Sequence, residues 1–256
     1  MSGRKCVVLL YDYLDTMALP WLKAGYDVVS VDGKHPEGLT HDLYHPTGAV
    51  HHKIGMWFEA SRTTEQAIEL ARKIGPENII MVFGFPECTY LTNAGNRWFV
   101  HPDDKHLPRD KQRPHPLYPN RMQDRRDAVE LARFVPLVAA ALHCPVWAFE
   151  NPRIGYLSTV WRDPDHWFDP CDYGGYLPED HQHKTFSDVY PGRDAYRKPT
   201  GIWCSPGFKM PERKPVPPVG KDFPGWAKCG GKSDRTKEIR SATPEGFALA
   251  VFCANE

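Results

Sequence analysis

The chain has 256 residues, of which 41% are hydrophobic and 25% are charged, as expected for one globular domain of α/β size, with or without an appendage. Its 32 Lys and Arg residues balance 32 Asp and Glu residues, which excludes a uniformly basic nucleic-acid coat and an acidic disordered chain. The seven cysteines stand singly with no CxxC pair, so we expect no disulfide framework and no bound metal. The first apolar run is too short for a signal peptide and nothing approaches a membrane span, which favours a cytoplasmic protein without a membrane or obligate protein partner.

The N-terminal 150 residues alternate apolar runs with helical patterns. We predict strands at 6–11, 27–31, 78–85 and 145–149, and helices at 18–24, 65–74 and 121–143, the last bent at Pro136. In the second helix Ile68, Ala71 and Ile74 occur at helical spacing, and Gly75 ends it. This alternation indicates an α/β, Rossmann-like fold with a doubly wound, mainly parallel sheet, whose ligands bind beyond the carboxyl ends of the strands.

The regular alternation stops after residue 151. Eight prolines fall in 191–224 alone, which predicts an irregular region of loops and short strands, and a closing helix is expected after Pro244. We therefore expect residues 1–152 plus 242–256 to form the Rossmann-like catalytic domain, and residues 153–241 to form an irregular substrate-recognition region near the C-terminus.

Positive charge is concentrated in two stretches. Residues 191–241 hold twelve Lys and Arg against five acids, and a second basic cluster lies in 105–126. Such loops beside the ligand-binding edge of a sheet would neutralise phosphates, although a solvated loop surface is the alternative. The residues we expect to contact nucleic acid are Arg97, Lys228, Lys232, Arg235 and Lys237.

A thiol and a carboxyl group follow two of the predicted strands. Cys88 comes just after the strand at 78–85, and Glu150 ends the strand at 145–149. A thiolate that adds to an electron-poor ring needs an acid to protonate the ring nitrogen, and a buried Glu can supply that proton. The alternative is a structural Cys and a loop Glu, which are commoner in proteins.

The first predicted β-α-β unit offers a cofactor pocket. The turn from Asp12 to Met17 follows the first strand, and Asp32 follows the second, where an acid can accept both hydroxyls of an adenosine ribose or be simply a turn residue. The turn has no glycine and no GxGxxG motif, which argues against a pyrophosphate dinucleotide. S-adenosylmethionine, which is cationic and carries no phosphate, suits this acidic turn better.

Several motifs together resemble a known family. They are Leu10-Tyr11-Asp12-Tyr13, Val31-Asp32, Gly84-Phe85-Pro86-Glu87-Cys88-Thr89, Phe149-Glu150-Asn151-Pro152, Cys171-Asp172-Tyr173-Gly174-Gly175-Tyr176 and Arg240-Ser241-Ala242-Thr243-Pro244-Glu245. In this order and spacing they resemble the cytosine-5 DNA methyltransferases, most closely the short bacteriophage forms. The resemblance spans almost the whole chain and implies a class I methyltransferase fold, a DNA partner and a bacterial or phage-infected host cell.

The resemblance also implies roles for individual residues. Cys88 would be the nucleophile that adds to carbon 6 of a flipped-out cytosine, and Glu150 the acid that holds ring nitrogen 3, with Asn151 shaping its turn and Lys198 supporting the base. The residues implied to bind S-adenosylmethionine, or a modified form of it, are Asp12, Tyr13, Leu14, Asp15, Thr16, Asp32, Phe85 and Pro86.

Three departures from the family pattern leave other functions open. Asp15 stands where the family has glycine, Glu87 stands where it has proline, and there is no Arg-x-Arg strand. A carboxylate beside a thiol raises its pKa. These changes could indicate a different donor, a modified-pyrimidine substrate or a weakened enzyme. The alternatives are a catalytically silent DNA-binding relative, or an enzyme that modifies a free pyrimidine nucleotide.

Overall fold

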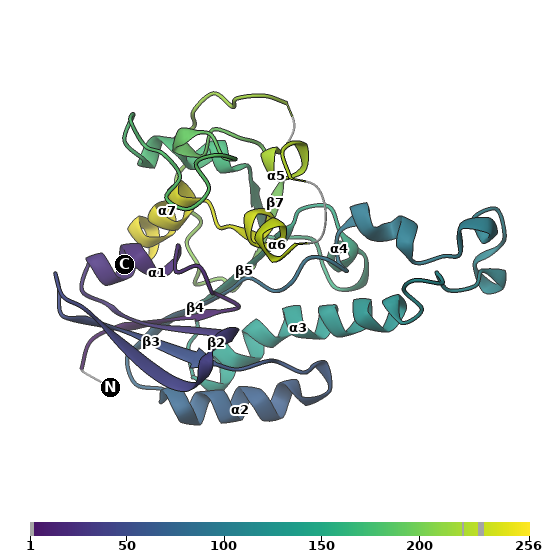
Figure 1. The fold of residues 1–256 in the computed structure, drawn as a ribbon. Helices are drawn as coiled ribbons and strands as arrows, with labels where there is room; N and C mark the ends of the chain where they lie inside the picture. Colours follow the sequence, from purple (N-terminus) through teal and green to yellow (C-terminus); the bar gives the residue numbers. More distant parts are fainter. Residues whose placement is uncertain (1–2, 222, 230–232) are drawn as a thin grey trace.

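A mixed seven-stranded sheet with helices on both faces organises the chain (Figure 1). The computed structural model describes residues 3–221, 223–229 and 233–256. The strand order is β3-β2-β1-β4-β5-β7-β6. The strands are β1 (Cys6–Leu10), β2 (Asp27–Tyr44), β3 (Ala49–Gly55), β4 (Ile79–Gly84), β5 (Trp147–Pro152), β6 (His166–Phe168) and β7 (Thr200–Cys204).

The centre of the sheet is parallel. β1 pairs in parallel with β2 and β4, and β4 pairs in parallel with β5, whereas β7 is antiparallel to both β5 and β6. The expected α/β fold with a Rossmann-like, doubly wound and mainly parallel sheet is therefore confirmed.

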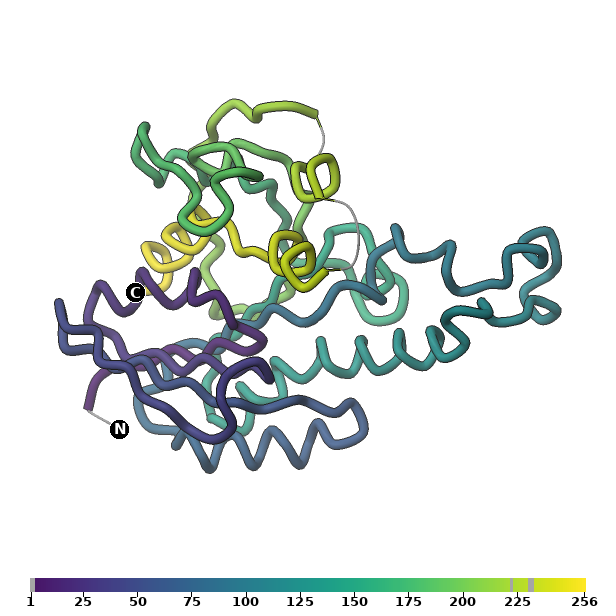
Figure 2. Tube along the Cα trace, in the orientation of Figure 1, coloured from purple at the N-terminus to yellow at the C-terminus, as the bar shows by residue number. Residues whose placement is uncertain are grey.

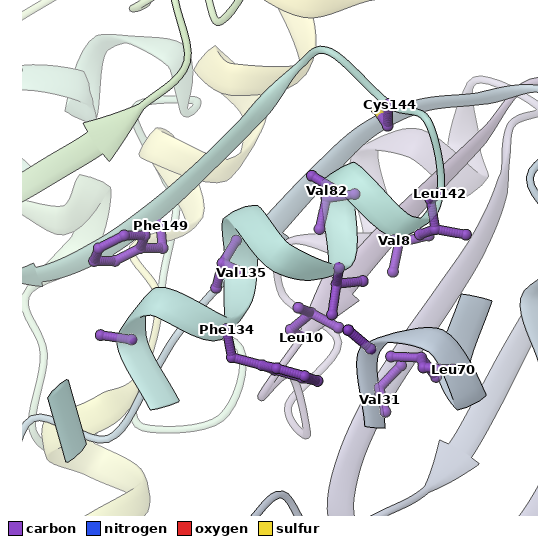
Figure 3. Packing of buried hydrophobic residues seen from close by; sticks show 14 of the residues in the cluster. Val8, Leu10, Val31, Leu70, Val82, Phe134, Val135, Leu142, Cys144 and Phe149 are labelled. Carbon is purple, nitrogen blue, oxygen red and sulfur yellow. The ribbon is translucent and has the colours of Figure 1, made fainter. Parts of the chain in front are cut away.

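Two hydrophobic cores lie on the two faces of the sheet. β1 is buried along its whole length, and its side chains alternate, so that Val8 and Leu10 enter one core while Val7 and Leu9 enter the other. The helices α2 (Thr63–Ile74) and α3 (Arg121–Ala141) cover the first core, which Figure 3 shows from close by. The helices α1 (Ala18–Lys23) and α7 (Glu245–Asn255) cover the second.

The predicted helices are confirmed, with one correction to a helix face. α1, α2, α3 and α7 form at the expected positions, and Pro136 lies inside α3. Ile68, however, is 43% exposed, while Leu70 is fully buried. The buried face of α2 is set by Ala67, Leu70, Ala71 and Ile74, because these residues face the sheet at the i, i+3, i+4 and i+7 positions.

The edge of the sheet beside β2 was not visible in the sequence. Val28–Asp32 of β2 pair with residues 51–55 of β3, and the residue numbers increase together, which is the register of a parallel pair. Leu39–Tyr44 pair with residues 54–49 in reverse order, as in an antiparallel hairpin. β3 thus lies between the two halves of β2. The second half is polar and exposed, so it gave no apolar pattern, and its pairing with β3 holds it in place.

The expected boundary at residue 152 leaves two strands of the sheet, β6 and β7, outside the predicted catalytic domain. β6 and β7 both come from residues 153–241, and all five residues of β7 are buried. β7 pairs with β5 on the side opposite β4. Without β7, β5 would be an edge strand with unpaired backbone groups. A separate recognition region therefore remains a proposal only for the loops of this segment.

The remaining elements are short helices and 3-10 turns. The helices α4 (Tyr156–Val160), α5 (Pro224–Ala227) and α6 (Asp234–Ser241) lie after β5, as do the 3-10 turns η5 (Pro170–Tyr176) and η6 (Gly192–Asp194). Earlier 3-10 turns are η1 (Ala60–Arg62), η2 (Asn93–Trp98), η3 (Pro102–Asp104) and η4 (Arg109–Lys111). A satellite core of Phe186, Val189, Tyr190, Tyr196, Phe223, Ile239 and Ala242 supports the loops after β5. No helix of the described ranges has both the length and the apolar character needed to cross a bilayer.

Candidate active site

The carboxyl ends of β1, β4 and β5 bring the candidate reactive residues to one edge of the sheet. β4 ends at Gly84, where an added Cβ would lie 2.4 Å from Val135 of α3, so glycine lets this helix pack close against the strand end. The next residues are tied to β1, because the Phe85 amide donates to the carbonyl of Leu10 at 3.0 Å. Pro86 is buried and Cys88 is partly exposed.

A tight turn follows Cys88. The amides of Leu91 and Thr92 both donate to the Cys88 carbonyl at 3.0 Å, and the Tyr156 amide donates to the Leu91 carbonyl at 2.7 Å. This segment, residues 85–92, is called the Cys88 loop below. Its backbone is thereby fixed between the end of β4 and the start of α4.

Glu150 and Asn151 lie inside β5 rather than in the turn beyond it. Glu150 pairs with Ile202 and Asn151 with Gly201, so their side chains project to opposite faces of the sheet. The Asn151 amide nitrogen donates to the Pro86 carbonyl at 2.9 Å. The expectation that Asn151 shapes a turn is corrected: its side chain joins β5 to the Cys88 loop, because the strand continues to Pro152.

Charge couples Cys88, Glu150 and Lys198. Burial raises the pKa of the Cys88 thiol to about 11; the positive charge of Lys198 lowers it, and the charges of Glu150 and Glu87 raise it. Burial also raises the pKa of Glu150, and Lys198 opposes that rise. The resting pair is therefore a protonated thiol beside a carboxyl group that holds its proton more firmly than usual.

Lys198 reaches this place from the segment before β7. Its backbone amide donates to Asp169 Oδ1 at 2.8 Å, and the Thr200 hydroxyl donates to the Lys198 carbonyl at 2.8 Å. Its Nζ lies 5.7 Å from the ring centroid of Phe223. β7 begins only at Thr200, so Lys198 is held by side-chain bonds to its backbone rather than by the sheet.

A buried polar network lies beneath the candidate donor loop, residues 12–16. Asp12 is only 4% exposed, and its Oδ2 accepts a hydrogen bond from the Ser30 hydroxyl at 3.0 Å, while His51 Nε2 lies 2.9 Å from the same hydroxyl. Burial and the nearby charge of Asp15 raise the pKa of Asp12 to about 7. Burial lowers the pKa of His51 to about 4, so this histidine is neutral at pH 7.

Asp15 adopts the backbone conformation that glycine favours. Its φ is 60°, in the left-handed region. Its carboxylate accepts a hydrogen bond from Lys53 Nζ at 2.9 Å and lies 3.8 Å from His51 Nε2. The extra charge at this glycine position is therefore paired with β3, a partner 38 residues away that the sequence pattern could not identify.

The other expected donor residues lie around the same loop. Tyr13 is exposed with Lys34 Nζ 4.9 Å from its ring centroid, and Leu14 packs against the satellite core. Asp32 Oδ1 accepts a hydrogen bond from the Lys34 amide at 2.8 Å. A cavity of about 360 Å³ adjoins the loop, and its lining includes Leu14, Asp15, Thr16, Leu19 and Lys53.

Trp57 is a candidate donor-binding residue that sequence analysis missed. It is 72% exposed, and its indole covers Gly33, where an added Cβ would lie 2.1 Å from the ring. Gly33 follows Asp32 directly, so an exposed aromatic face stands beside the candidate ribose acid. Trp57 is 24 positions away in the sequence, and only the return of the chain through β3 brings it there.

Most of the residues expected to bind nucleic acid contact other groups of the protein. Arg97 is exposed and stacks on Trp98, with 4.8 Å from guanidinium to ring centroid. The other described members bond to neighbours: Lys228 donates to the Val189 carbonyl at 2.8 Å, Arg235 pairs with Asp188 at 2.6 Å, and Lys237 pairs with Asp234 at 3.2 Å. Lys232 lies outside the described residues.

Across the described parts of the chain, His, Cys, Asp and Glu side chains form no group of three suited to a metal ion.

Comparison with known proteins finds likenesses among solved structures. No family model and no curated protein matches the chain. Among solved structures, a crystal structure described as a putative DNA modification methyltransferase encoded within an Escherichia coli prophage is similar with a TM-score of 0.35 and 14% sequence identity. The alignment covers 78% of this chain and 46% of that chain, so this chain spans less than half the length of that protein.

Proposed function

We propose that this chain is an S-adenosylmethionine-dependent DNA methyltransferase that acts at carbon 5 of cytosine. The observation that carries the proposal is the electrostatic coupling of Cys88, Glu150 and Lys198 at the carboxyl edge of a Rossmann-like sheet. Ligands of such sheets bind at this edge. The motifs that resemble the cytosine-5 DNA methyltransferases contribute the first two of these residues.

The chemistry of the residues around the donor loop suits S-adenosylmethionine. Asp32 has one carboxylate oxygen bonded to the Lys34 amide, which orients the other for ribose hydroxyls, and Trp57 offers a flat aromatic face beside it. Asp15, although paired with Lys53, lines the cavity beside the loop and places a carboxylate where a cationic donor would bind. When bound, the donor would supply an electrophilic methyl group.

Cys88 and Glu150 would act together on a cytosine flipped out of the duplex. The Cys88 sulfur forms a bond to carbon 6, the electron pair of the 5,6 double bond becomes available at carbon 5, and the Glu150 proton neutralises the charge at nitrogen 3. After group transfer, loss of the carbon 5 proton and departure of the Cys88 thiolate restore the double bond. Burial raises the pKa of Glu150, which favours the protonated carboxyl group that this step needs.

The thiol needs help to ionise. With a pKa of about 11, only about one Cys88 in ten thousand is a thiolate at pH 7. Lys198 is the residue whose charge lowers this pKa most. Glu150 opposes the thiolate only when it is ionised, so a protonated Glu150 that contacts the base would leave Glu87 as the nearby negative charge that opposes the thiolate.

A mechanism-based adduct tests the proposal. A duplex oligonucleotide with 5-fluorocytosine cannot lose a proton from carbon 5, so with S-adenosylmethionine the active enzyme should form a complex that survives denaturant. The complex should be absent in Cys88→Ser and present in Cys229→Ser, a control at another partly exposed cysteine. Failure of the wild type to form it under any donor condition would overturn the enzymatic proposal.

A catalytically silent DNA-binding relative is the second candidate. It is favoured by the high pKa of Cys88, to which Glu87 contributes. Such a protein would bind duplex DNA with the usual salt dependence but give no adduct. The adduct experiment therefore separates the two functions directly.

A further inference from the structure

An arm of the chain projects beyond the N-terminal end of α3. Residues 93–120 leave the body after the Cys88 loop, make the 3-10 turns η2, η3 and η4, and return to enter α3 (Figures 1 and 2). α3 has 21 residues, or about 30 Å of helix, and the arm extends the molecule past its end. The main cores draw no residue from the arm.

The arm is nevertheless stapled internally. The outgoing and returning segments of the arm meet at the isolated Val100–Pro114 bridge, and the His101 amide donates to the Arg113 carbonyl at 2.8 Å. Arg113 also forms a two-pronged pair with the buried carboxylate of Asp104, with both bonds at 2.8 Å. A surface segment that is ordered by its own hydrogen bonds but has no hydrophobic core is typical of a binding element.

The exposed cations of the arm lack acid partners. Among the described residues, no hydrogen bond or ion pair engages the side-chain charges of Arg97, Lys105, Arg109 or Lys111, all of which are exposed. Lys228, Arg235 and Lys237 in the late basic stretch are instead bonded to neighbours. The arm therefore carries four exposed cations that no acid of the described residues neutralises.

Two buried arginines connect the arm to the Cys88 loop. Arg125 is 9% exposed and donates to the Tyr90 carbonyl at 2.8 Å and to Asn96 Oδ1 at 2.6 Å, so one guanidinium bonds to both the loop and the arm. Arg121 is 7% exposed and donates to the Thr89 carbonyl at 3.4 Å. Gly95 makes this possible, since an added Cβ would lie 2.5 Å from Arg121 Nη2.

Aromatic rings take the place of carboxylates around these arginines. The Arg125 guanidinium lies 3.7 Å from the ring centroid of Phe99 and 4.5 Å from that of Tyr156, and Arg121 lies 5.0 Å from the Phe99 centroid. No ion pair joins either guanidinium to an acid of the described ranges. Burying two cations without a counter-charge costs free energy. Here the backbone carbonyls of Thr89 and Tyr90 and the faces of the aromatic rings offset that cost.

We propose that the arm of residues 93–120 binds the phosphate backbone of duplex DNA through Arg97, Lys105, Arg109 and Lys111, and that Arg121 and Arg125 are positioning residues that transmit this contact to the Cys88 loop. The inference rests on the proposed function in taking DNA as the substrate. When phosphates bind the arm, the arm shifts toward the duplex. Because the Arg125 guanidinium bonds to both Asn96 and Tyr90, a shift of Asn96 moves Tyr90 in the Cys88 loop as well. DNA binding and placement of the thiol are thereby linked.

A charge-removal variant tests the surface. In K105Q/R109Q/K111Q, affinity for a duplex of random sequence at 150 mM salt should fall at least tenfold, and the slope of log affinity against log salt should decrease by about two to three, near 0.9 for each lost phosphate contact. The control K5Q/R72Q/K209Q removes three exposed cations on segments that lead to or from the amino ends of the parallel strands, and it should bind like the wild type.

The outcomes separate this inference from the proposed function. If the wild type forms the fluorocytosine adduct but the arm variant keeps the wild-type affinity and salt slope, the arm proposal is overturned and the enzymatic one stands. If the wild type forms no adduct but the arm variant loses affinity and slope, the arm proposal stands alone. Absence of any wild-type DNA binding would overturn both.

The coupling has its own measurement. Duplex DNA should change the rate of Cys88 alkylation by iodoacetamide at least threefold in the wild type, followed by peptide mass spectrometry. In R125K, which keeps the charge but cannot bond both Tyr90 and Asn96 in a planar fork, DNA affinity should stay within twofold while this change is lost. R133K, on the same helix but paired with Glu130, is the control. An R125K protein that melts like the wild type and still shows the full change would show that Arg125 has only a structural role.

Discussion

At the scale of single residues, the site depends on groups whose proton affinity burial has shifted. Cys88 and Glu150 both hold their protons more tightly than in water, and Lys198 opposes the shift in each case. Asp12 shows the same effect beneath the donor loop. These shifts arise because the groups are withdrawn from solvent while only one cation lies near the reactive pair.

Glu150 is expected to serve turnover rather than DNA affinity. In Glu150→Gln the side chain keeps its shape but loses the proton donated to nitrogen 3, so methyl transfer to duplex DNA should fall at least a hundredfold. DNA affinity should remain within about twofold. The test compares steady-state transfer with anisotropy titration, and wild-type turnover in the variant would remove Glu150 from the mechanism.

Asp12 should make stability depend on pH. Its pKa is raised from 3.8 to about 7 in the folded protein, so its contribution to stability is fully present below pH 3.8 and is lost as the pH rises to about 7. Asp12→Asn can still accept the Ser30 hydrogen bond but carries no charge. It should therefore raise the free energy of unfolding at pH 8, on the order of 4 kcal/mol, and have little effect at pH 4.

Thermal unfolding at several pH values checks the Asp12 prediction. Asp42→Asn is the matched control, because Asp42 is exposed on the hairpin. Equal effects of Asp12→Asn at pH 4 and pH 8 would contradict a raised pKa.

At the scale of elements, the sequence located helices well but could not always assign their faces. α2 was predicted at 65–74, and it forms at Thr63–Ile74. The spacing of Ile68, Ala71 and Ile74 fits a helix, yet Ile68 is exposed because Ala67 and Leu70 provide the rest of the buried stripe. The choice between two overlapping apolar stripes is made by the sheet on which the helix packs.

This difference predicts the effect of two matched substitutions. Leu70→Ala should lower the free energy of unfolding by about 2–4 kcal/mol, since it removes fully buried methyl groups and leaves a cavity. Ile68→Ala on the same helix should change it by less than about 1 kcal/mol. Urea unfolding measures both, and similar losses in the two variants would contradict the assigned face.

At the scale of the whole molecule, the sheet and the core on the α1 side combine residues from distant parts of the chain. The core on the α1 side joins Val7 and Trp21 from the N-terminal part to Ile202, Phe247 and Val251 from the C-terminal part. β7 also supplies the outer neighbour of β5, which carries Glu150. The active-site edge is therefore a product of the complete chain.

A fragment of residues 1–152 should accordingly fail to fold. It lacks β7 and α7, so β5 would be an exposed apolar edge strand and one face of the sheet would be uncovered. We expect no cooperative thermal transition by circular dichroism and strong association in gel filtration. A monomeric fragment with a cooperative transition would show instead that the N-terminal part is an independent domain.

The sequence by itself determined the β-α-β order, the helices and the position of Cys88 after a buried strand, because these depend on local periodicity and on residues next to each other in the chain. The tertiary structure decided what depends on distant partners. Lys53 pairs with Asp15, Trp57 covers Gly33, and the long hairpin and β7 take their places in the sheet through contacts between segments tens of residues apart. The fold also holds Lys228, Arg235 and Lys237 against neighbouring groups and leaves Arg97, Lys105, Arg109 and Lys111 of the arm without an acid partner among the described residues. Composition alone cannot make this distinction, since an ion pair depends on distance and not on residue count.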